Sequence, residues 1–482
     1  METPLYLKNL FWYLIPFVIR QFLPIITLPI LTSYLSLNDF GLFALAISYG
    51  VFGSGIVNLG LINVYERIFF ELSPTLRKNL LFTILIFTFS IFLFALSITY
   101  FFSDTIAKFI FRQNQLKEIL TLALAFQTFK TFNQYFFIYL KNYENAQKYT
   151  YLAIFESILM IGISLYFVVE LSMGIYGFIF GQFLGVLIIF LMTFCLLFYP
   201  FSNFFELELL RNQLKVSLPL TPRIFFGVIN TQFDRYMLGL ITTIGGVGLY
   251  DIGQKIANTT FSYMTTIQNV YSPQVYKRLF SKNAQVRSSI GPYLTPYFYL
   301  SISVCLFVGI FSHEILYFLT PSEFYQAAPI ISILCLLYGF YFFGKQPQLL
   351  YAKKTGLISL LTLVSITLNI ILNIPLIHYF GMMGAAFATT LAGVISTAIY
   401  FYFGQKYTHI AYEKKVYFIL LFFVASIIIV LILEELEVPY YLFLISKIII
   451  SFAFILIGLT NQIIDIKKIK EYIHLLNQRS HV

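Results

Sequence analysis

The sequence predicts an all-α membrane protein with about fourteen transmembrane helices. Of its 482 residues, 59% are hydrophobic and only 11% are charged, whereas soluble domains carry roughly 25% charged residues. Apolar runs of about twenty residues recur along the chain, and this is the length of helix that spans the ~30 Å hydrocarbon core. Basic residues between these runs gather on alternate loops. Together these observations exclude a soluble fold.

The apolar runs give the expected order of the helices. The predicted spans are Asn9–Leu35, Gly41–Val64, Asn79–Phe102, Leu120–Leu140, Tyr149–Val169, Gly174–Phe198, Ser217–Leu240, Val247–Val270, Ile290–Phe311, Ala328–Leu350, Gly356–Ile377, Gly381–Phe403, Val416–Leu433 and Tyr441–Thr460. The first run follows a short polar start without a small-residue cleavage site. We therefore expect a retained first helix and not a removed signal peptide.

The distribution of basic residues orients the chain in the membrane. With the N-terminus in the cytoplasm, the predicted cytoplasmic segments hold 21 Lys and Arg residues and the opposite loops hold three. This asymmetry is what the positive-inside rule requires, and a miscounted helix early in the chain would destroy the alternation. We therefore expect both termini in the cytoplasm, and we assign the formal charge of +10 to membrane orientation and not to nucleic-acid binding.

Glycine landmarks indicate an internal repeat. Gly41 and Gly248 open the second and eighth spans, and Gly174 and Gly381 open the sixth and twelfth; each pair is 207 residues apart. Both halves begin and end on the same side of the membrane, so they would form parallel repeats related by an axis along the membrane normal. Coincidence is the competing explanation, because glycines often begin helices at tight loops.

The repeat divides the chain into three expected parts. We predict an N-terminal lobe of helices 1–6 over residues 1–205 and a C-terminal lobe of helices 7–12 over residues 206–410. Residues 411–482 would add helices 13–14 and a cytoplasmic tail. The loops between spans are short, and the chain carries no nucleotide-binding P-loop. The cysteines Cys195, Cys305 and Cys335 lie in apolar runs without metal or disulfide spacing. We therefore expect no metal site and no cofactor.

Charged residues inside the spans are the candidates for function. A charge at the bilayer centre costs about 2.5–3.5 kcal/mol, so these residues should face a hydrated interior. Basic residues outnumber acids there, which favours an anionic substrate. The basic positions are Arg20, Lys130, Arg223, Arg235, Lys255, Lys345 and Lys447, and the acidic ones are Glu156, Asp234 and Asp251.

Several of these positions have a structural alternative. Asp251 and Lys255 are four residues apart on one helix and could neutralise each other. Asp234 and Arg235 are adjacent and do not face each other, so each needs its own partner. Asp234 could pair with an intramembrane cation for structure or take part in ion coupling. Lys447 is alone on an appended helix, where snorkelling or interface packing is favoured. We favour a cavity-lining role for Arg20, Lys130, Arg223 and Lys345.

Prolines mark the first helix of each predicted half. Pro24 and Pro29 lie in the first span, and Pro219 and Pro222 lie near the start of the seventh. Proline removes a backbone donor and bends a helix, which membrane helices tolerate when neighbours or water satisfy the freed groups. A bend that serves alternating access and a static kink are equally compatible with this pattern.

Short motifs along the chain resemble one transporter family. They are Leu28-Pro29-Ile30-Leu31-Thr32, Tyr34-Leu35-Ser36, Asp39-Phe40-Gly41, Asn58-Leu59-Gly60, Ser217-Leu218-Pro219-Leu220, Asp234-Arg235 and Val247-Gly248-Leu249-Tyr250. In combination and order they resemble polysaccharide and O-antigen flippases of the Wzx type. That family belongs to the multidrug/oligosaccharidyl-lipid/polysaccharide (MOP) exporter superfamily, with the multidrug extruders and the lipid II flippase.

The resemblance implies a fold and a substrate. It implies two six-helix lobes around a central cavity that opens alternately to each side of a bacterial inner membrane. It implies translocation of an undecaprenyl-pyrophosphate-linked oligosaccharide from the cytoplasmic to the outer leaflet, as in lipopolysaccharide biosynthesis. Membrane lipids are expected partners, and a polysaccharide polymerase and glycosyltransferases are candidate partners. Many O-antigen flippases have twelve helices, so the extra pair here resembles the lipid II flippase, in which added helices form a groove for the lipid tail.

Two alternative functions remain at this stage. A cation-coupled multidrug extruder of the same fold would use acidic cavity residues, for which Glu156, Asp234 and Asp251 are available. An enzyme such as a membrane glycosyltransferase is disfavoured, because no sugar-nucleotide motif is present and the acidic cluster Glu434, Glu435 and Glu437 lies in a short loop.

Overall fold

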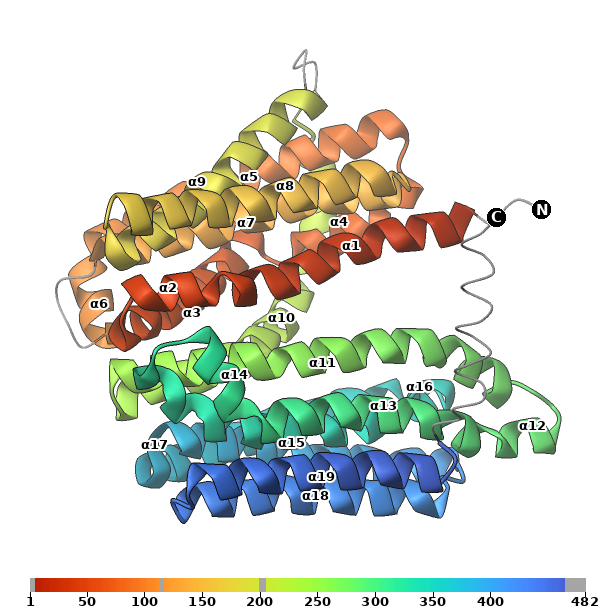
Figure 1. Cartoon of the computed structure of the whole chain (residues 1–482). Coiled ribbons are helices and arrows are strands. Elements are labelled where there is room, and N and C mark those ends of the chain that lie inside the picture. The colour runs from red at the N-terminus through yellow and green to blue at the C-terminus, as the bar shows by residue number, and fades with distance from the viewer. Residues whose placement is uncertain (1–4, 112–116, 199–204, 345, 464–482) are drawn as a thin grey trace, which may run out of the picture. The chain divides into compact units, whose positions relative to one another are not determined.

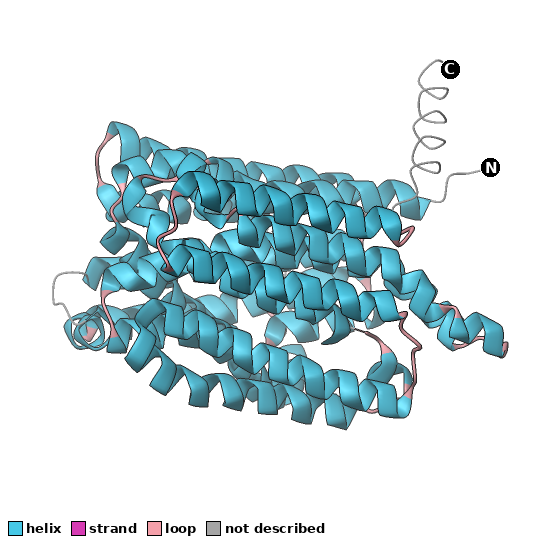
Figure 2. Ribbon diagram, turned by 60° about the horizontal axis from the view of Figure 1, so that its bottom comes forward, coloured by secondary structure: helices cyan, strands magenta, loops and turns pink. Residues whose placement is uncertain are grey.

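The computed structural model describes residues 5–111, 117–198, 205–344 and 346–463. Within these residues all regular structure is helical (Figure 2). The chain separates into two compact units. The first contains the residues up to Ile252 with the short segments Phe318–Tyr325 and Ile377–Met382, and the second contains the remainder. The predicted lobe boundaries at residues 205 and 410 stay predictions.

The first unit is organised around α7. Its elements are α1 (Leu5–Ile26), α2 (Leu28–Tyr34), α3 (Leu37–Asn58), α4 (Leu61–Ile68), η1 (Phe69–Glu71), α5 (Pro74–Phe101), α6 (Ser103–Phe111), α7 (Lys117–Asn142), α8 (Ala146–Leu165), the π-helical η2 (Tyr166–Glu170), α9 (Gly174–Phe198), α10 (Leu207–Ile241) and the first turns of α11 (Ile244–Leu279). α7 packs against α3, α5 and α9, and α8 packs between α1 and α9 (Figure 1). Aromatic rings fill the core of this packing: Phe129 and Phe132 of α7 contact Phe190 of α9.

The second unit contains the rest of α11 and the helices that follow. These are α12 (Ala284–Ser288), α13 (Ile290–Ile310), α14 (Ser312–Leu319), η3 (Ser322–Ala327), α15 (Ala328–Gly344), α16 (Gln348–Tyr351), α17 (Thr355–Tyr407), α18 (Lys414–Glu435) and α19 (Tyr440–Thr460). Within them, the segments Phe318–Tyr325 and Ile377–Met382 belong to the first unit. α13 packs against α15 and α18, and α18 packs against α19. Gly339 of α15 admits the ring of Phe423 on α18, and Gly309 of α13 admits Ile427. The hairpin of α18 and α19, which is appended after the predicted repeat, is thus packed into the core of the second unit. We call it the appended hairpin.

The helices accommodate the predicted spans. Ten helical stretches of the described chain are long and apolar enough to cross a membrane. One of them, α17, contains two predicted spans, and the polar helices α7, α10 and α11 supply the other three. At 1.5 Å per residue, α7 is about 39 Å long, enough to cross the hydrocarbon core. The prediction of an all-α membrane protein is confirmed.

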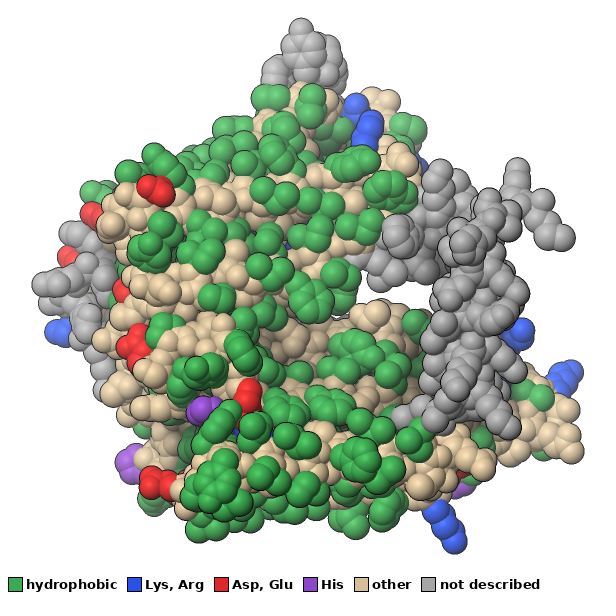
Figure 3. All heavy atoms as spheres, viewed as in Figure 1, with side chains coloured by type: hydrophobic (Ala, Val, Ile, Leu, Met, Phe, Trp, Pro, Cys, Tyr) green, Lys and Arg blue, Asp and Glu red, His purple; other side chains and the backbone are tan. Residues whose placement is uncertain are grey.

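The surface of the helices is apolar, as lipid contact requires. Phe94, Leu421 and Ile449 are 68%, 67% and 61% exposed. The space-filling view shows hydrophobic side chains spread over the visible helices, with few charged side chains between them (Figure 3). In water such exposed apolar surface would be costly, whereas lipid chains cover it without penalty.

The helix breaks differ in part from those expected. The first predicted span divides at Thr27, between Pro24 and Pro29, whereas α10 continues through Pro219 and Pro222. The Thr27 hydroxyl donates to the carbonyl of Leu23 at the division. The second predicted span was too long at its end, since α3 stops at Asn58 and the next two residues adopt left-handed φ values of 48° and 74°.

A reciprocal contact supports the predicted repeat. A Cβ atom on Gly41 of α3 would overlap the carbonyl oxygen of Ile244 in α11, and one on Gly248 would overlap the carbonyl oxygen of Leu37. Leu37 and Ile244 begin these two helices and are separated by the same 207 residues as the two glycines. The glycine of each helix therefore contacts the first residue of the other helix, at equivalent positions of the two predicted repeats. Such a reciprocal pattern is typical of a twofold-related interface.

The second pair of glycine landmarks also shares a positive φ angle. Gly174 has φ +54° and Gly381 has φ +57°, a region that only glycine enters without a steric cost. Gly174 begins α9, and Gly381 breaks α17 between the two spans predicted within it. The requirement for a left-handed residue at the same point of each half explains why both positions are glycine.

Candidate functional site

The first candidate site is a cavity of about 210 Å³ between α1, α7 and α8 in the first unit. Its lining residues are Arg20, Leu23, Pro24, Lys130, Gln134, Phe137, Glu156, Ser157, Met160 and Ile161. The wall is mainly apolar, but three of its members are ionisable. Charges are costly within apolar helices, so their presence at one cavity makes it the first candidate for a functional site.

An ion pair joins two sides of this cavity. The Nη2 atom of Arg20 on α1 donates to Oε2 of Glu156 on α8 at 2.9 Å. The guanidinium also lies over the ring of Phe137 on α7, 4.8 Å from its centroid. The two partners are unequal in access, since the Arg20 side chain is 39% exposed and that of Glu156 only 5%. Glu156 is a fixed buried anion, and Arg20 reaches into the open space.

A buried asparagine fixes the carboxylate. The side-chain amide of Asn133 donates to Oε1 of Glu156 at 2.8 Å and to the carbonyl oxygen of Val186 at 3.0 Å. Asn133 is fully buried. Both carboxylate oxygens therefore accept a hydrogen bond, which is the condition under which a buried charge is tolerated. Sequence reasoning missed Asn133, although an amide one helical turn after the predicted Lys130 is a recognisable signal.

Lys130 gives the cavity its net charge. Its ammonium lies 5.5 Å from the ring centroid of Phe126. Among the residues that the structure describes, no hydrogen bond or ion pair holds it. With both Arg20 and Lys130 cationic and Glu156 anionic, the ionised cavity carries one excess positive charge. Lone cations in a low-dielectric wall attract anions strongly.

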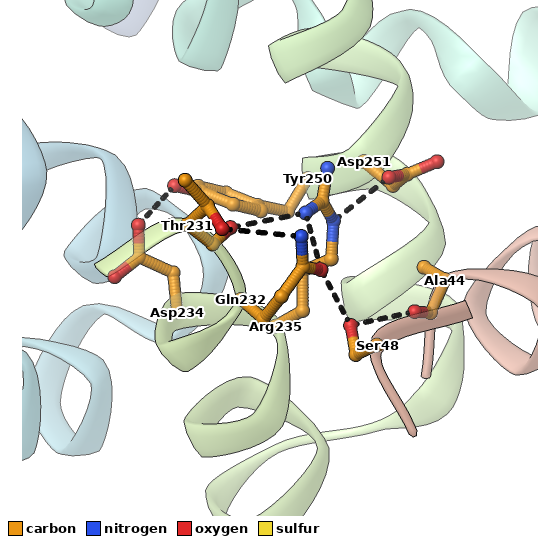
Figure 4. Close-up of polar contacts among 8 residues, drawn as sticks. All are labelled: Ala44, Ser48, Thr231, Gln232, Asp234, Arg235, Tyr250 and Asp251. Atoms are coloured by element: carbon orange, nitrogen blue, oxygen red, sulfur yellow. Dashed lines mark hydrogen bonds and ion pairs between the residues drawn. The ribbon is translucent and has the colours of Figure 1, made fainter. Parts of the chain in front are cut away.

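A second polar cluster lies where α10 meets the start of α11 and α3. The Nε atom of Arg235 donates to Oδ1 of Asp251 at 2.9 Å, and its Nη1 atom donates to Oε1 of Gln232 at 3.1 Å. The hydroxyl of Ser48 on α3 donates to the same Gln232 oxygen at 2.9 Å. Asp234 turns to the other side of α10, where it accepts from the Tyr250 hydroxyl at 2.8 Å (Figure 4).

The expected partners of Asp234 and Arg235 are thus separate, as their adjacency in sequence requires. Both Asp234 and Asp251 are buried, and both accept a hydrogen bond from a side chain. Gln232, Ser48 and Tyr250 complete the cluster and were missed from sequence, because uncharged polar residues are common in membrane helices.

The predicted site residues fall into several places. Arg20, Lys130 and Glu156 come together at the cavity, and Arg235, Asp234 and Asp251 belong to the second cluster. Lys255 lies one helical turn after Asp251, within the second unit, and its neutralisation by Asp251 stays a prediction. Arg223 lies in α10, but its side chain and the whole of Lys345 are outside the described residues.

Lys447 contradicts one of two sequence-based alternatives. We expected this lysine of α19 to snorkel or to pack at an interface, and its side chain is 0% exposed, which excludes snorkelling. Its ammonium donates to both carboxylate oxygens of Glu314 on α14, at 2.9 and 2.8 Å. It also lies 3.8 Å from the ring centroid of Phe443. The carboxylate on a different helix could not be anticipated from the spacing along α19.

Comparison with known families identifies the family of this chain. The family described as polysaccharide biosynthesis protein matches residues 6–277, more than half of the chain. The chain belongs to this family. The predicted relationship to polysaccharide flippases is thereby confirmed at the level of the family. The match covers both polar clusters and the reciprocal glycine contact.

A curated relative extends the family assignment. The probable low-salt glycan biosynthesis flippase Agl15 of Haloferax volcanii is 29% identical over 193 residues, which are 39% of this chain and 40% of that protein. The alignment therefore spans only two fifths of the relative's length. What that protein transports is a property of that protein.

Two solved structures have a fold similar to that of this chain. The lipid II flippase MurJ in an inward closed conformation is similar with a TM-score of 0.62 at 16% identity, over 91% of this chain and all of that chain. An inward-facing multidrug resistance MATE family transporter of the MOP superfamily is similar with a TM-score of 0.52 at 15% identity, over 83% of this chain and 97% of that one. At such low identity the likeness establishes the fold alone.

Proposed function

We propose that this family member is a flippase that moves an undecaprenyl-pyrophosphate-linked oligosaccharide from the cytoplasmic to the outer leaflet by alternating access. The observation that carries the proposal is the cavity of Arg20, Lys130 and Glu156, which is cationic and set within apolar helices. A pyrophosphate is the part of such a substrate that the bilayer core rejects most strongly. Basic side chains replace its hydration, with arginine forming directed hydrogen bonds and lysine acting as a point charge.

The cavity volume limits which part of the substrate it holds. At about 30 Å³ per water, a volume of 210 Å³ holds roughly seven water molecules. This suits the charged headgroup and is below the usual range of about 300–1,000 Å³ for whole ligands. The polyprenyl tail would stay in the lipid, and the sugars would need space that opens during transport. An inside-negative potential would favour outward movement of the anion by about 2.3 kcal/mol per charge per 100 mV.

The pairing of the acids favours an anionic substrate over cationic drugs. An extruder for cations would need carboxylates that face its substrate. Here Glu156 is bonded to Arg20 and Asp251 is bonded to Arg235. Cationic drugs would first have to displace these arginines, whereas an anion would be attracted by the excess positive charge.

The proposal extends to the setting of the protein. We place it in a bacterial inner membrane as a multi-pass transporter with both termini in the cytoplasm, acting in polysaccharide biosynthesis without catalysing a reaction itself. Glycosyltransferases would build its substrate on the cytoplasmic side, and a polymerase would consume the delivered units. Delivery of O-antigen units for lipopolysaccharide is the form that the sequence motifs favour.

Reconstituted transport tests the function. Purified protein in proteoliposomes would receive a fluorescent undecaprenyl-pyrophosphate-linked oligosaccharide, and a membrane-impermeant quencher would report its leaflet. We expect protein-dependent flipping that falls at least tenfold in Lys130→Gln, because the cavity loses its excess charge. Lys148→Gln, at the start of α8 and outside the cavity, is the matched control and should flip normally. Flipping that is absent from the wild type, or unaffected by Lys130→Gln and Arg20→Gln, contradicts the proposal.

A further inference from the structure

The guanidinium of Arg20 is only partly engaged by its partner. Of its five N–H donors, one is committed to Glu156 at 2.9 Å. In the part of the chain that the structure describes, the others have no hydrogen-bond acceptor, and the side chain remains 39% exposed at the cavity. The face of the guanidinium is supported by the ring of Phe137. The guanidinium of Arg20 is therefore bonded through one N–H donor, and its other donors are available to a ligand.

Glu156, in contrast to Arg20, is fixed in position. Its Oε1 atom accepts a hydrogen bond from Asn133, which also donates to the backbone carbonyl of Val186 in α9. The carboxylate is buried and cannot follow Arg20 when the long arginine side chain changes rotamer. Exchange of the Arg20 contact would therefore leave Glu156 in place with one oxygen still satisfied.

The charges at the cavity make Glu156 a competitor of any anion. A phosphate that approaches Arg20 and Lys130 is attracted by two cations and repelled by the carboxylate that already occupies one of them. Glu156 therefore weakens binding of the anion and assists its departure. Glu156 also interacts electrostatically with Lys130, but no hydrogen bond or ion pair among the described side chains holds that ammonium, so Lys130 still attracts the anion.

We propose that Glu156 is the resting counter-anion of Arg20, which the pyrophosphate of the substrate displaces on binding and which recaptures Arg20 when the substrate leaves. This inference rests on the proposed flippase function and assigns a positioning role to a residue that does not bind the substrate. It explains why an anion-binding cavity contains a buried carboxylate. A transporter needs binding that is reversible at each step, and an internal competitor supplies that reversibility.

Affinity and transport should change in opposite directions in Glu156→Gln. The amide keeps the shape and an acceptor for Asn133 but removes the competing charge. We expect the full-length protein in nanodiscs to bind inorganic pyrophosphate and undecaprenyl pyrophosphate about tenfold more tightly, which corresponds to about 1.4 kcal/mol. We expect flipping in proteoliposomes to slow by a similar factor, because Arg20 is no longer recaptured. A purely structural ion pair predicts weaker binding together with slower flipping.

Two further variants keep the test sharp. Glu156→Asp preserves the charge on a shorter side chain, so its affinity and flipping rate should lie between those of the wild type and Glu156→Gln, even if the latter folds poorly. Glu66→Gln removes a carboxylate that pairs with Lys141 at the protein surface, and it should leave affinity and flipping unchanged.

The outcomes separate this inference from the proposed function. Wild-type protein that neither binds undecaprenyl pyrophosphate nor flips the labelled substrate contradicts the function itself. Wild-type protein that binds and flips, with equal or weaker binding in both Glu156 variants, overturns the counter-anion role alone. Tighter binding of undecaprenyl pyrophosphate than of inorganic pyrophosphate supports a lipid headgroup as the displacing anion, and binding of inorganic pyrophosphate only overturns it.

Discussion

At the level of single residues, the arginine of the second cluster shows how charge is tolerated within the apolar helices. Arg235 is bonded to Asp251, Gln232 and the carbonyl oxygen of Thr231, so its guanidinium is held by side chains and backbone together. The side chains of Arg235 and Asp251 are only 14% and 4% exposed. Substitution of either residue would break this buried ion pair (Figure 4).

We therefore expect Arg235→Gln to destabilise the protein by roughly 3–5 kcal/mol, the usual cost of breaking a buried ion pair. The double variant Arg235→Gln with Asp251→Asn should recover much of this loss, because both charges of the buried pair are then removed together. Thermal unfolding in detergent, followed by size-exclusion chromatography, measures both effects. Equal loss of stability in the single and double variants would contradict this explanation, because removing the remaining charge would then recover nothing.

Residues also mark the limit of sequence reasoning about the site. The positions of Arg20, Lys130 and Glu156 were predicted because charges within apolar runs are costly. Their mutual arrangement was not predictable, since Arg20 and Glu156 are 136 residues apart and helical spacing identifies a face without identifying its neighbour. Asn133 and Phe137 were missed because such residues are ordinary in helices until a charge is known to lie beside them.

At the level of elements, a buried ion pair in the second unit joins α19 to α14. Lys447 of α19 and Glu314 of α14 join segments far apart in the chain. Around them Tyr299 of α13 stacks on Phe454 of α19 with centroids 4.7 Å apart and planes at 7°, and the Tyr299 hydroxyl donates to the Phe454 carbonyl. The appended hairpin is therefore fixed to the second unit by polar as well as apolar contacts.

Lys447→Met should destabilise the second unit by roughly 3–5 kcal/mol, because Glu314 loses its bidentate partner, whereas Lys447→Met combined with Glu314→Met should be near neutral. Lys415→Met is the matched control, since Lys415 pairs with Glu413 while both side chains are about 30% exposed, and such pairs contribute about 0–1 kcal/mol. Limited proteolysis of the loop before α19 and the midpoint of thermal unfolding report the effect. A single variant as stable as the control would show that α19 does not depend on this pair.

Elements were also the scale at which the sequence was most informative. Apolar runs of about twenty residues located the spans within a few residues because the thickness of the bilayer sets their length. The short helices α4, α6, α12 and α14 were not predicted, since segments of five to nine residues carry too little periodicity. The end of α3 at Asn58 was missed because the apolar run continues past the left-handed Leu59 and Gly60.

At the scale of the whole molecule, the reciprocal contact of α3 and α11 leaves no room for a side chain at Gly41 or at Gly248. A Cβ at each glycine would meet a backbone carbonyl, which cannot rotate away as a side chain could. Because the two environments are related by the repeat, substitutions at the two positions should have similar consequences.

Gly41→Ala and Gly248→Ala should each destabilise the protein by roughly 1–3 kcal/mol, the cost typical of forcing an extra methyl group into a packed contact. Gly162→Ala on α8 is the control, because nothing lies within 4 Å of a Cβ at that position and alanine favours the helix. Unfolding temperatures of the three variants in one detergent give the comparison. A large loss in only one of the two paired glycines would contradict the equivalence of the two halves.

The reciprocal glycine contact also bears on how such a molecule could arise. A surface on which Leu37 and Gly41 meet Ile244 and Gly248, each the counterpart of the other, would close just as well between two copies of a single polypeptide of half the length. Duplication and fusion of a gene for that shorter chain would keep the interface intact without inventing new contacts. The glycines at both positions would then be inherited remnants of a homodimer.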